Sequence, residues 1–323
     1  MEDWLRKKDI KKGKNPKPPY VRKPYLVSCY GFKINCMLLS FPVRKREFAN
    51  ILLNDHIAKT ISDTSLKVRS FTMTPESLSL AIQKETESIK PEKIIGIDRN
   101  LRNVTFGNYE KIILVNTSEI LKIKENYSHV ASSVTRDDWR IRKKIRGRLG
   151  IRQARRVQQR IHKISKSLVE YSKKQKAMIV FEDLKGIRKL YRKGNGQGRK
   201  FRRKLNSLPN YELERQTTYK ANWEGVPIGH IDPRGTSKLC PRCGGKLQED
   251  WQRRRDLWCG ICEKWQDRDV VAAMNISRKG LVRLANPQGG TDETMKGNLI
   301  SDLNQEPVIL RVDVSKLIME LVL

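Results

Sequence analysis

Four cysteines in the C-terminal third of the chain have the spacing of a metal site. They form two pairs, Cys240-Pro-Arg-Cys243 and Cys259-Gly-Ile-Cys262, with fifteen residues between the pairs. Each Cys-x-x-Cys places two thiolates on one tight turn, and two such turns facing each other complete a tetrahedral sulfur site for zinc. Two disulfides or redox pairs are the disfavoured alternative, because the first residues do not form a secretory signal. Four thiolates leave no open position for a substrate, so the sequence predicts a structural zinc site.

Three acidic residues stand where carboxylates could bind divalent cations. Asp98 and Glu182 each follow a short apolar run, and Asp269 begins a helix-like segment. Hydrolysis of a phosphodiester needs stabilisation of the attacking and leaving oxygens, which two Mg²⁺ ions about 4 Å apart, held by acids from different elements, provide. Each acid alone also has an ordinary explanation, as a helix N-cap or a residue of a strand-end turn. Their combination with the cysteine motif in a strongly basic chain favours a metal-dependent site that acts on phosphodiesters.

The segments that carry these acids predict a mixed α/β fold. A buried strand leads to Asp98, and two further strand-like stretches follow it, which indicates a meander. A long helical pattern, a second buried strand ending at Glu182, another helix and another strand come next. A Gly-rich basic loop is expected at 194–204. The predicted strands cover 94–97, 104–106, 112–115, 177–181 and 226–231, and the predicted helices cover 136–176 and 211–223.

The charge of the chain points to a polyanionic partner. The 323 residues include 67 Lys and Arg against 35 Asp and Glu, a formal net charge of +32. Nucleic acid is favoured over a membrane surface because no amphipathic anchor or lipidation signal accompanies the charge, and no apolar stretch is long enough to span a bilayer. Hydrophobic residues make up 38% of the chain, so a buried core is expected and full disorder is not.

Much of this charge lies in one stretch. Residues 136–206 contain 26 basic and five acidic residues, and within 136–176 apolar residues recur mostly at intervals of three or four. This pattern predicts a long helix with one apolar face and basic residues on its other faces. We expect nine of its basic residues to contact nucleic-acid phosphates: Arg140, Lys143, Lys144, Arg146, Arg148, Arg152, Arg155, Arg156 and Arg160.

Four segments together resemble a known family. They read GIDRNLRNVTFGN at 96–108, IVFEDLKGIR at 179–188, TSKLCPRCGGK at 236–246 and CGICEKWQDRDVVAAMNI at 259–276. In this order and at these spacings they resemble the TnpB (OrfB) proteins of bacterial and archaeal insertion sequences, which are relatives of the type V CRISPR effector nucleases. The resemblance extends from about Lys67 to the C-terminus.

The resemblance implies a RuvC-like nuclease domain of RNase H fold. Its catalytic acids, which would hold two Mg²⁺ ions, would be Asp98, Glu182 and Asp269; in the sequence DRD the family's ligand is the second aspartate, which is why Asp269 is chosen over Asp267. The implied activity is RNA-guided DNA cleavage by hydrolysis, although such proteins are often described as transposases. The implied partners are a guide RNA from the transposon and a target DNA, with the basic helix on the backbone of their heteroduplex. No small-molecule substrate is expected, and the implied location is the prokaryotic cytoplasm, on the nucleoid when DNA is bound.

Two features depart from the family pattern. Val271 stands where the third motif usually has Asn, whereas Asn275 matches the later Asn of that motif. About ninety residues precede the first motif, fewer than in relatives that carry a helical recognition insert inside a wedge-like β-barrel. The N-terminal region is therefore expected to be shortened, with a basic arm and part of a wedge-like module.

The predicted organisation is an α/β RNase H-like (RuvC) domain with an inserted zinc ribbon, a long basic helical segment and a small N-terminal β-rich module. The predicted boundaries are 1–90 for the arm and β-rich module, 91–235 for the first part of the nuclease domain with the basic helix at 136–176, 236–265 for the ribbon, 266–286 for the last part of the nuclease domain, and 287–323 for a tail.

Two other functions are compatible with parts of the sequence. A catalytically impaired or truncated nucleic-acid-binding protein, either a guided repressor or a remnant, would agree with the short N-terminal region, but the complete acid triplet opposes it. A DNA-strand-transfer transposase would also use an acid triplet on an RNase H fold. The zinc motif just before the last acid agrees better with the TnpB pattern.

Overall fold

The computed structural model describes the chain as two units, 1–85 and 86–323. The described residues are 26–28, 30–44, 46–135, 138–184, 186, 194, 196, 198–206, 208–253, 255–285, 306–314 and 317. The predicted basic arm at 1–24 and most of the predicted tail at 287–323 lie outside these residues. None of the described helices is long and apolar enough to cross a membrane.

The first unit is a small β-rich module. Its strands form two antiparallel three-stranded sheets, in the orders β1-β5-β6 and β2-β3-β4. Side chains alternate between exposed and partly buried along β5 and β6, as expected for strands with one covered face. The buried core consists of Leu39, Phe41, Leu53 and Phe71. The elements are β1 (Leu26–Ser28), β2 (Lys33–Asn35), β3 (Leu38–Arg44), β4 (Glu47–Leu52), α2 (Asp55–Ile61), β5 (Leu66–Met73) and β6 (Leu78–Lys84).

The second unit is built on a mixed six-stranded sheet in the order β11-β10-β7-β8-β9-β15. Strands β7, β8 and β9 form the predicted antiparallel meander, and β10 runs parallel to β7. The sheet is extended by β11, parallel to β10, and by β15, parallel to β9. The strands are β7 (Lys93–Arg99), β8 (Asn103–Gly107), β9 (Lys111–Asn116), β10 (Ala177–Glu182), β11 (Ile228–Ile231) and β15 (Val308–Asp313).

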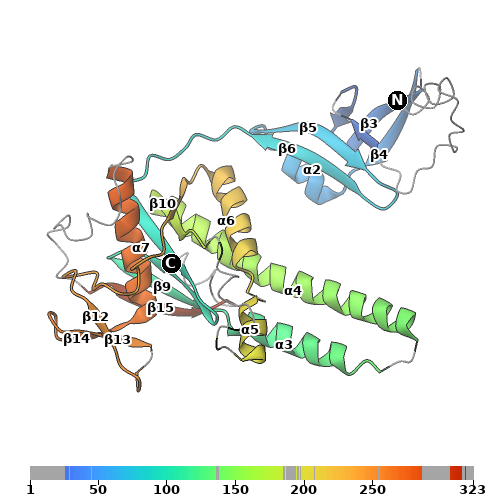
Figure 1. Ribbon diagram of the computed structural model, residues 1–323. Helices are drawn as coiled ribbons and strands as arrows, with labels where there is room; N and C mark the ends of the chain where they lie inside the picture. Colours follow the sequence, from blue (N-terminus) through green and yellow to red (C-terminus); the bar gives the residue numbers. More distant parts are fainter. Residues whose placement is uncertain are drawn as a thin grey trace, which may run out of the picture. The chain divides into compact units, whose positions relative to one another are not determined.

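Helices cover both faces of this sheet (Figure 1). Their bounds are α3 (Ser118–Ser132), α4 (Trp139–Lys174), α5 (Arg199–Asn206), α6 (Asn210–Glu224) and α7 (Arg268–Ala285). Alternate residues of β7 serve the two faces: Ile95 and Ile97 join the core with α3, α4 and α6, whereas Ile94 packs with Ile276 of α7. Helix α7 lies so close that a Cβ at Gly96 would meet the carbonyl oxygen of Ala273 at 2.3 Å. A glycine is therefore required at this crossing.

The long helix α4 has two different halves. Its buried residues begin at Val157, and the part before that residue extends beside α3, away from the sheet (Figure 1). Asp138 caps its N-terminus by accepting a hydrogen bond from the backbone N–H of Arg140. The predicted helix is confirmed with slightly narrower bounds than 136–176.

The cysteine-containing segment forms a separate small sheet. Strands β12 (Leu247–Glu249), β13 (Asp256–Cys259) and β14 (Lys264–Asp267) pair antiparallel, and β14 leads directly into α7. Because no residue separates β14 from α7, a movement of the ribbon would also move the first turn of α7.

Three elements that lie around the large sheet were not predicted. Helix α3 follows the meander, α5 occupies part of the stretch expected to be a Gly-rich loop, and β15 lies in the predicted tail. The apolar residues of β15 explain its place, because Val312 and the adjoining Val314 and Leu317 join the main core.

Candidate functional site

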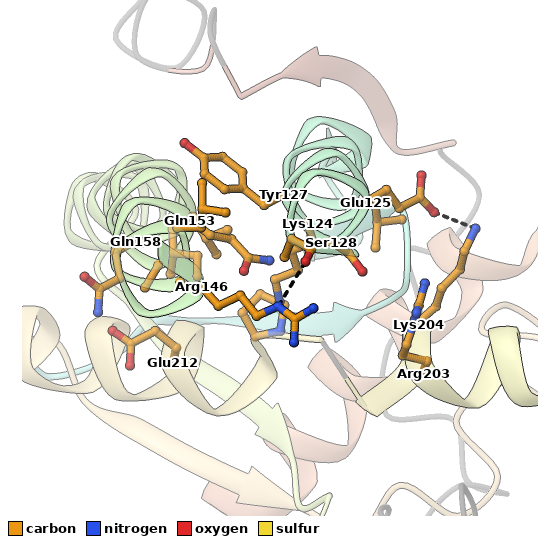
Figure 2. Close-up of a pocket in the computed structure, with 18 residues that line it drawn as sticks. Lys124, Glu125, Tyr127, Ser128, Arg146, Gln153, Gln158, Arg203, Lys204 and Glu212 are labelled. Carbon is orange, nitrogen blue, oxygen red and sulfur yellow. Dashed lines mark hydrogen bonds and ion pairs between the residues drawn. The ribbon is translucent and has the colours of Figure 1, made fainter. Parts of the chain in front are cut away.

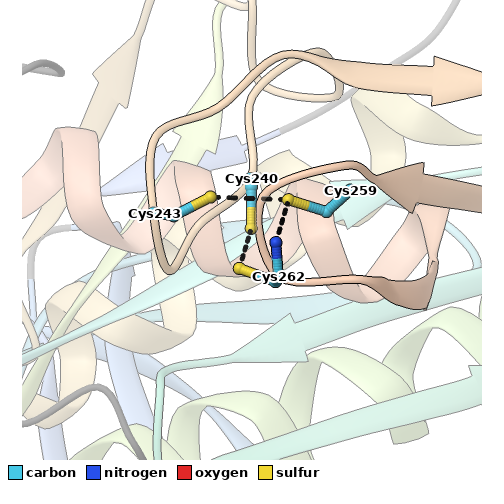
Figure 3. Close-up of side chains that lie close together, drawn as sticks. All are labelled: Cys240, Cys243, Cys259 and Cys262. Atoms are coloured by element: carbon cyan, nitrogen blue, oxygen red, sulfur yellow. Dashed lines mark hydrogen bonds between the residues drawn. The ribbon is translucent and has the colours of Figure 1, made fainter.

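The four predicted cysteine ligands converge. One Sγ atom from each of Cys240, Cys243, Cys259 and Cys262 lies within 4.8 Å of the others (Figure 3). The loop before β12 supplies Cys240 and Cys243, the last residue of β13 is Cys259, and the turn between β13 and β14 supplies Cys262. The arrangement matches a closed, four-sulfur zinc site, so the cluster is compatible with a zinc ribbon.

Hydrogen-bond donors surround the sulfur atoms. The backbone N–H groups of Gly245 and Cys262 donate to Cys243 Sγ and Cys259 Sγ, both at 3.4 Å, and Gln266 Nε2 donates to Cys240 Sγ at 3.2 Å. Burial raises the pKa of the Cys240 thiol, but hydrogen bonds to its sulfur outweigh burial and bring the pKa down to about 7. At Cys240 this favours the thiolate, which is the metal-binding form, whereas burial raises the pKa of the Cys243 and Cys262 thiols.

The three predicted acids meet at one edge of the large sheet. Asp98 and Glu182 lie at the carboxyl ends of the adjacent parallel strands β7 and β10, and Asp269 lies in the first turn of α7. A single amide joins two of them: Asn100 Nδ2 donates to Asp98 Oδ2 at 2.6 Å and to Asp269 Oδ1 at 3.0 Å. The acids are more widely spaced than the cysteines, which form the one cluster of at least three such ligands within 4.8 Å that the described part of the chain contains.

The negative charge at this edge is poorly compensated. Burial, followed by the charges of Glu182 and Asp269, raises the pKa of Asp98 to about 7. Burial also raises the pKa of Glu182, against the lowering effect of Thr236, which donates its hydroxyl to Glu182 Oε1 at 2.8 Å. A raised carboxyl pKa in a buried group of like charges is typical of a site that is completed by a cation.

Asp269 is held by more neighbours than the other two acids. Besides the bond from Asn100, its Oδ2 accepts hydrogen bonds from Asn103 Nδ2 at 2.7 Å and from Arg255 Nη2 at 2.8 Å. Its backbone N–H donates to the side chain of Asp267 at 2.9 Å, so the other aspartate of the DRD sequence acts as a helix-capping residue. Sequence reasoning missed Asn100, Asn103 and Arg255, whose role depends on contacts between distant segments.

The departure at Val271 has a packing explanation. Val271 is fully buried and packs with Cys240, Leu247, Leu257 and Cys259, the core of the ribbon. Asn275, which matches the family motif, donates to the backbone carbonyls of Thr236 and Leu239 at 2.7 and 2.8 Å. Both residues therefore fix the ribbon to α7.

A groove of about 460 Å³ opens beside Asp269. Its walls come from the β7–β8 turn, β9, the ribbon and β15, and they include the basic residues Arg102, Arg255 and Arg311. Arg311 Nη2 lies 3.5 Å from Asp267 Oδ2. The strand from the predicted tail thus forms part of the surroundings of the acid site.

Eight of the nine predicted basic residues lie in the part of α4 before Val157, and Arg160 lies just after it. Eight of the nine are exposed, and Arg160 is partly buried in an ion pair with Glu119 at 2.6 Å. Arg146 donates to the carbonyl oxygen of Ala131 at the end of α3. The structure therefore leaves most of these cations free to meet phosphates, and it uses Arg160 and Arg146 partly to hold the two helices together.

A second groove, of about 620 Å³, lies between α3 and α4 and reaches α5 (Figure 2). Its apolar floor includes Leu121 and Val157, and Lys124, Arg146 and Arg203 contribute positive charge. Lys204 at its rim pairs with Glu125 at 2.7 Å. The basic surface of this region therefore extends from α4 onto neighbouring helices.

Comparisons with known proteins place these features in a family. Residues 211–276 match the model of the Cas12f1-like TNB domain. The chain is 30% identical over 249 residues to the TnpB-like protein MJ0751 of Methanocaldococcus jannaschii, a match that spans 73% of this chain and 87% of that protein. It is 33% identical over 178 residues to a Streptomyces pristinaespiralis protein named "Putative RNA-guided DNA endonuclease", covering 51% of this chain and 40% of the relative.

A solved structure shares the fold. The cryo-EM structure of a Cas12f1–sgRNA–target DNA complex aligns with a TM-score of 0.57 at 16% identity, over 84% of this chain and 67% of that protein. The mixed α/β architecture predicted from the sequence is thus confirmed as a Cas12f-like fold. With its matching motifs and this level of similarity to MJ0751, the chain belongs to the TnpB family.

Proposed function

We propose that this protein is an RNA-guided DNA endonuclease that hydrolyses phosphodiesters at Asp98, Glu182 and Asp269. The observation that carries the proposal is the convergence of these acids, more than eighty residues apart in sequence, on one sheet edge. The names of its relatives support the guided activity, since one is described as an RNA-guided DNA endonuclease and a structural neighbour contains a guide RNA and target DNA.

The donor set at this edge fits magnesium. Carboxylate oxygens are the ligands that Mg²⁺ prefers, and the raised pKa values of Asp98 and Glu182 reflect charge that a divalent cation would neutralise. Bound Mg²⁺ would stabilise the attacking and leaving oxygens of the phosphodiester. The chain's own residues orient the ligands: Asn100 sets Asp98 against Asp269, and Thr236 fixes Glu182.

We assign the sheet with its flanking helices to an RNase H-like RuvC domain. The assignment is supported by the antiparallel meander β7–β9 followed by the parallel strand β10, with acids at the ends of the first strand and of β10. In this assignment the nuclease domain comprises 91–235, 266–286 and, from the predicted tail, strand β15, and the zinc ribbon occupies 236–265 between its parts. Zinc at the four cysteines would hold the ribbon and, through β14, the start of α7.

The exposed basic half of α4 is the proposed contact for the guide–target heteroduplex. Its cations would neutralise phosphates without reading sequence, which is left to base pairing. Replacing Lys143 and Lys144 together by Gln should weaken nucleic-acid binding and lower the slope of log affinity against log salt by roughly two, about one for each lost phosphate contact. An unchanged slope would remove these two residues from the interface.

The decisive experiment is cleavage with a matched guide. The chain is expressed with the RNA from its own locus, and the purified complex is tested for Mg²⁺-dependent cutting of a complementary DNA target. Glu182→Ala should abolish cutting while RNA remains bound, and Glu249→Ala, on the exposed face of ribbon strand β12, should cut normally. Cutting by Glu182→Ala would refute the assignment of the site. Bound RNA without cutting by the unaltered chain would favour a guided binder, and joined DNA ends would favour strand transfer.

A further inference from the structure

Arg255 connects the ribbon to the acid site. It lies just before β13, and its carbonyl oxygen accepts a hydrogen bond at 2.8 Å from the backbone N–H of Arg268, the first residue of α7. Its guanidinium Nη2 donates to Asp269 Oδ2 at 2.8 Å. The backbone of Arg255 is therefore fixed beside the helix that carries Asp269, and the side chain crosses to the carboxylate.

The two partners of this ion pair are buried to very different degrees. The side chain of Arg255 is 63% exposed, whereas that of Asp269 is 8% exposed. Asp269 cannot leave its place in the first turn of α7, but the guanidinium can turn into solvent or into the adjoining groove of about 460 Å³. Breaking the pair thus requires only the movement of one long, exposed side chain.

The other groups in the described part of the chain that donate to the Asp269 carboxylate are neutral. Asn100 donates to Oδ1, and Asn103 donates to Oδ2 beside Arg255. Asn100 and Asn103 can hold the carboxylate in place while it binds a cation, because neither carries a charge that opposes one. Arg255 both occupies a lone-pair direction of Oδ2 and repels a second cation.

We propose that Arg255 is a positioning residue that neutralises Asp269 in the absence of a divalent cation and leaves it when a cation binds. The inference rests on the proposed function, because it takes Asp269 to be a divalent-cation ligand. One positive group is exchanged for another at the same oxygen, while Asn100 and Asn103 keep the carboxylate oriented. The affinity of the acid site for a divalent cation is then lower than it would be without Arg255, and cation binding releases the Arg255 side chain from Asp269.

The test is a titration with Mn²⁺, monitored by calorimetry, of the zinc-loaded unaltered chain, of three arginine variants and of Asp269→Asn. Arg255→Gln keeps a polar side chain but removes the charge, and it should bind Mn²⁺ about two- to fivefold more tightly, the range expected for loss of a partly exposed ion pair. Arg255→Lys keeps the charge and should stay close to the unaltered chain. The control, Arg253→Gln, changes an arginine that stacks on the Trp265 ring at 5.1 Å, so its affinity should not change.

The outcomes separate this inference from the proposed function. Equal or weaker Mn²⁺ binding by Arg255→Gln would overturn the exchange, while the acid site itself would still stand. An unaltered chain that binds no Mn²⁺, or binds it as well as Asp269→Asn does, would instead refute the acid site. Thermal unfolding gives a second measure: Arg255→Gln should lower the melting temperature without Mn²⁺, and saturating Mn²⁺ should restore it to that of the Mn²⁺-bound unaltered chain.

Discussion

The cysteine cluster and the acid cluster are assembled in opposite ways. The four cysteines come from 23 consecutive residues of one small sheet, and local backbone and side-chain donors already surround their sulfur atoms. The three acids come from two strands and a helix that are far apart in the sequence, and their charges oppose one another. A local site of this kind depends on its own loop geometry, whereas a site made by topology depends on the packing of the whole domain.

The first way to break this contrast is to remove one cysteine ligand. Cys259→Ser should lose zinc and unfold the ribbon, because zinc provides much of the stability of such small modules, several kcal/mol in general. Since β14 leads directly into α7, which carries Asp269, unfolding of the ribbon should also reduce cleavage. Zinc content, melting temperature and cutting are measured together. Full cutting without zinc would show that the acid site is independent of the ribbon.

A second change tests how far the acid site depends on distant packing. Gly96→Ala should lower the free energy of unfolding by about 3 kcal/mol, because the new Cβ would meet backbone atoms of α7. Urea unfolding measures the loss. The matched control is Gly147→Ala in the exposed part of α4, where a Cβ meets nothing within 4 Å, and it should gain about 0.5–1 kcal/mol of stability. Equal behaviour of the two variants would contradict the close packing at β7.

The pH dependence of stability tests the mutual repulsion of the carboxylates, which distinguishes the acid cluster from the cysteine cluster. With zinc bound and no other divalent cation present, the folded chain keeps a proton on Asp98 up to a pH of about 7, whereas the unfolded chain releases it near its ordinary pKa of 3.8. Stability should therefore fall as the pH rises from about 4 to 7, by on the order of 4 kcal/mol, or about 1.4 kcal/mol for each pH unit. Asp98→Asn should lack this part of the dependence. A wild-type profile identical to that of Asp98→Asn would refute the raised pKa.

The smallest expected effect concerns a residue that supports a ligand. Thr236→Val keeps the shape of the side chain but removes the hydroxyl that donates to Glu182. Cleavage at limiting Mg²⁺ should fall roughly tenfold, which is typical when the partner of a metal ligand is lost. Thr218→Val, whose hydroxyl bonds only within α6, is the control. Equal rates for Thr236→Val and the unaltered chain would show that Glu182 needs no such support.

The features of this molecule that could be predicted are those that depend on a local sequence pattern. Each of these features is a pattern within one continuous segment: the Cys-x-x-Cys pairs, the apolar strands that lead to Asp98 and Glu182, and the periodicity of α4. The structure has the corresponding elements. The use of the three acids in catalysis stays a prediction. Helix α3 and strand β15 were missed although both contain apolar residues, because the place of these residues depends on a sheet that forms from distant segments.

The neighbours of Asp269 could not be predicted for a related reason. Asn100, Asn103 and Arg255 are ordinary turn or loop residues in sequence, and 14 to 169 positions separate them from the aspartate. Their contacts exist only after the meander, the ribbon and α7 have come together. The exchange of Val for Asn at position 271 was similarly unexplained until the ribbon core was seen around it.

The pairing of β15 with β9 has a consequence for the order in which the molecule forms during synthesis. The side chains of Asn116 and Asp313 meet across 197 positions of chain, and Asp269 also joins its partners from far downstream. At a translation rate of about 5–20 residues per second, β15 is made on the order of ten seconds or more after the meander, which until then lacks this last strand of the sheet. During that interval the edge of β9 stays open to other strands, and until Asp269 has been made the nascent chain has no complete set of acids with which to cut nucleic acid.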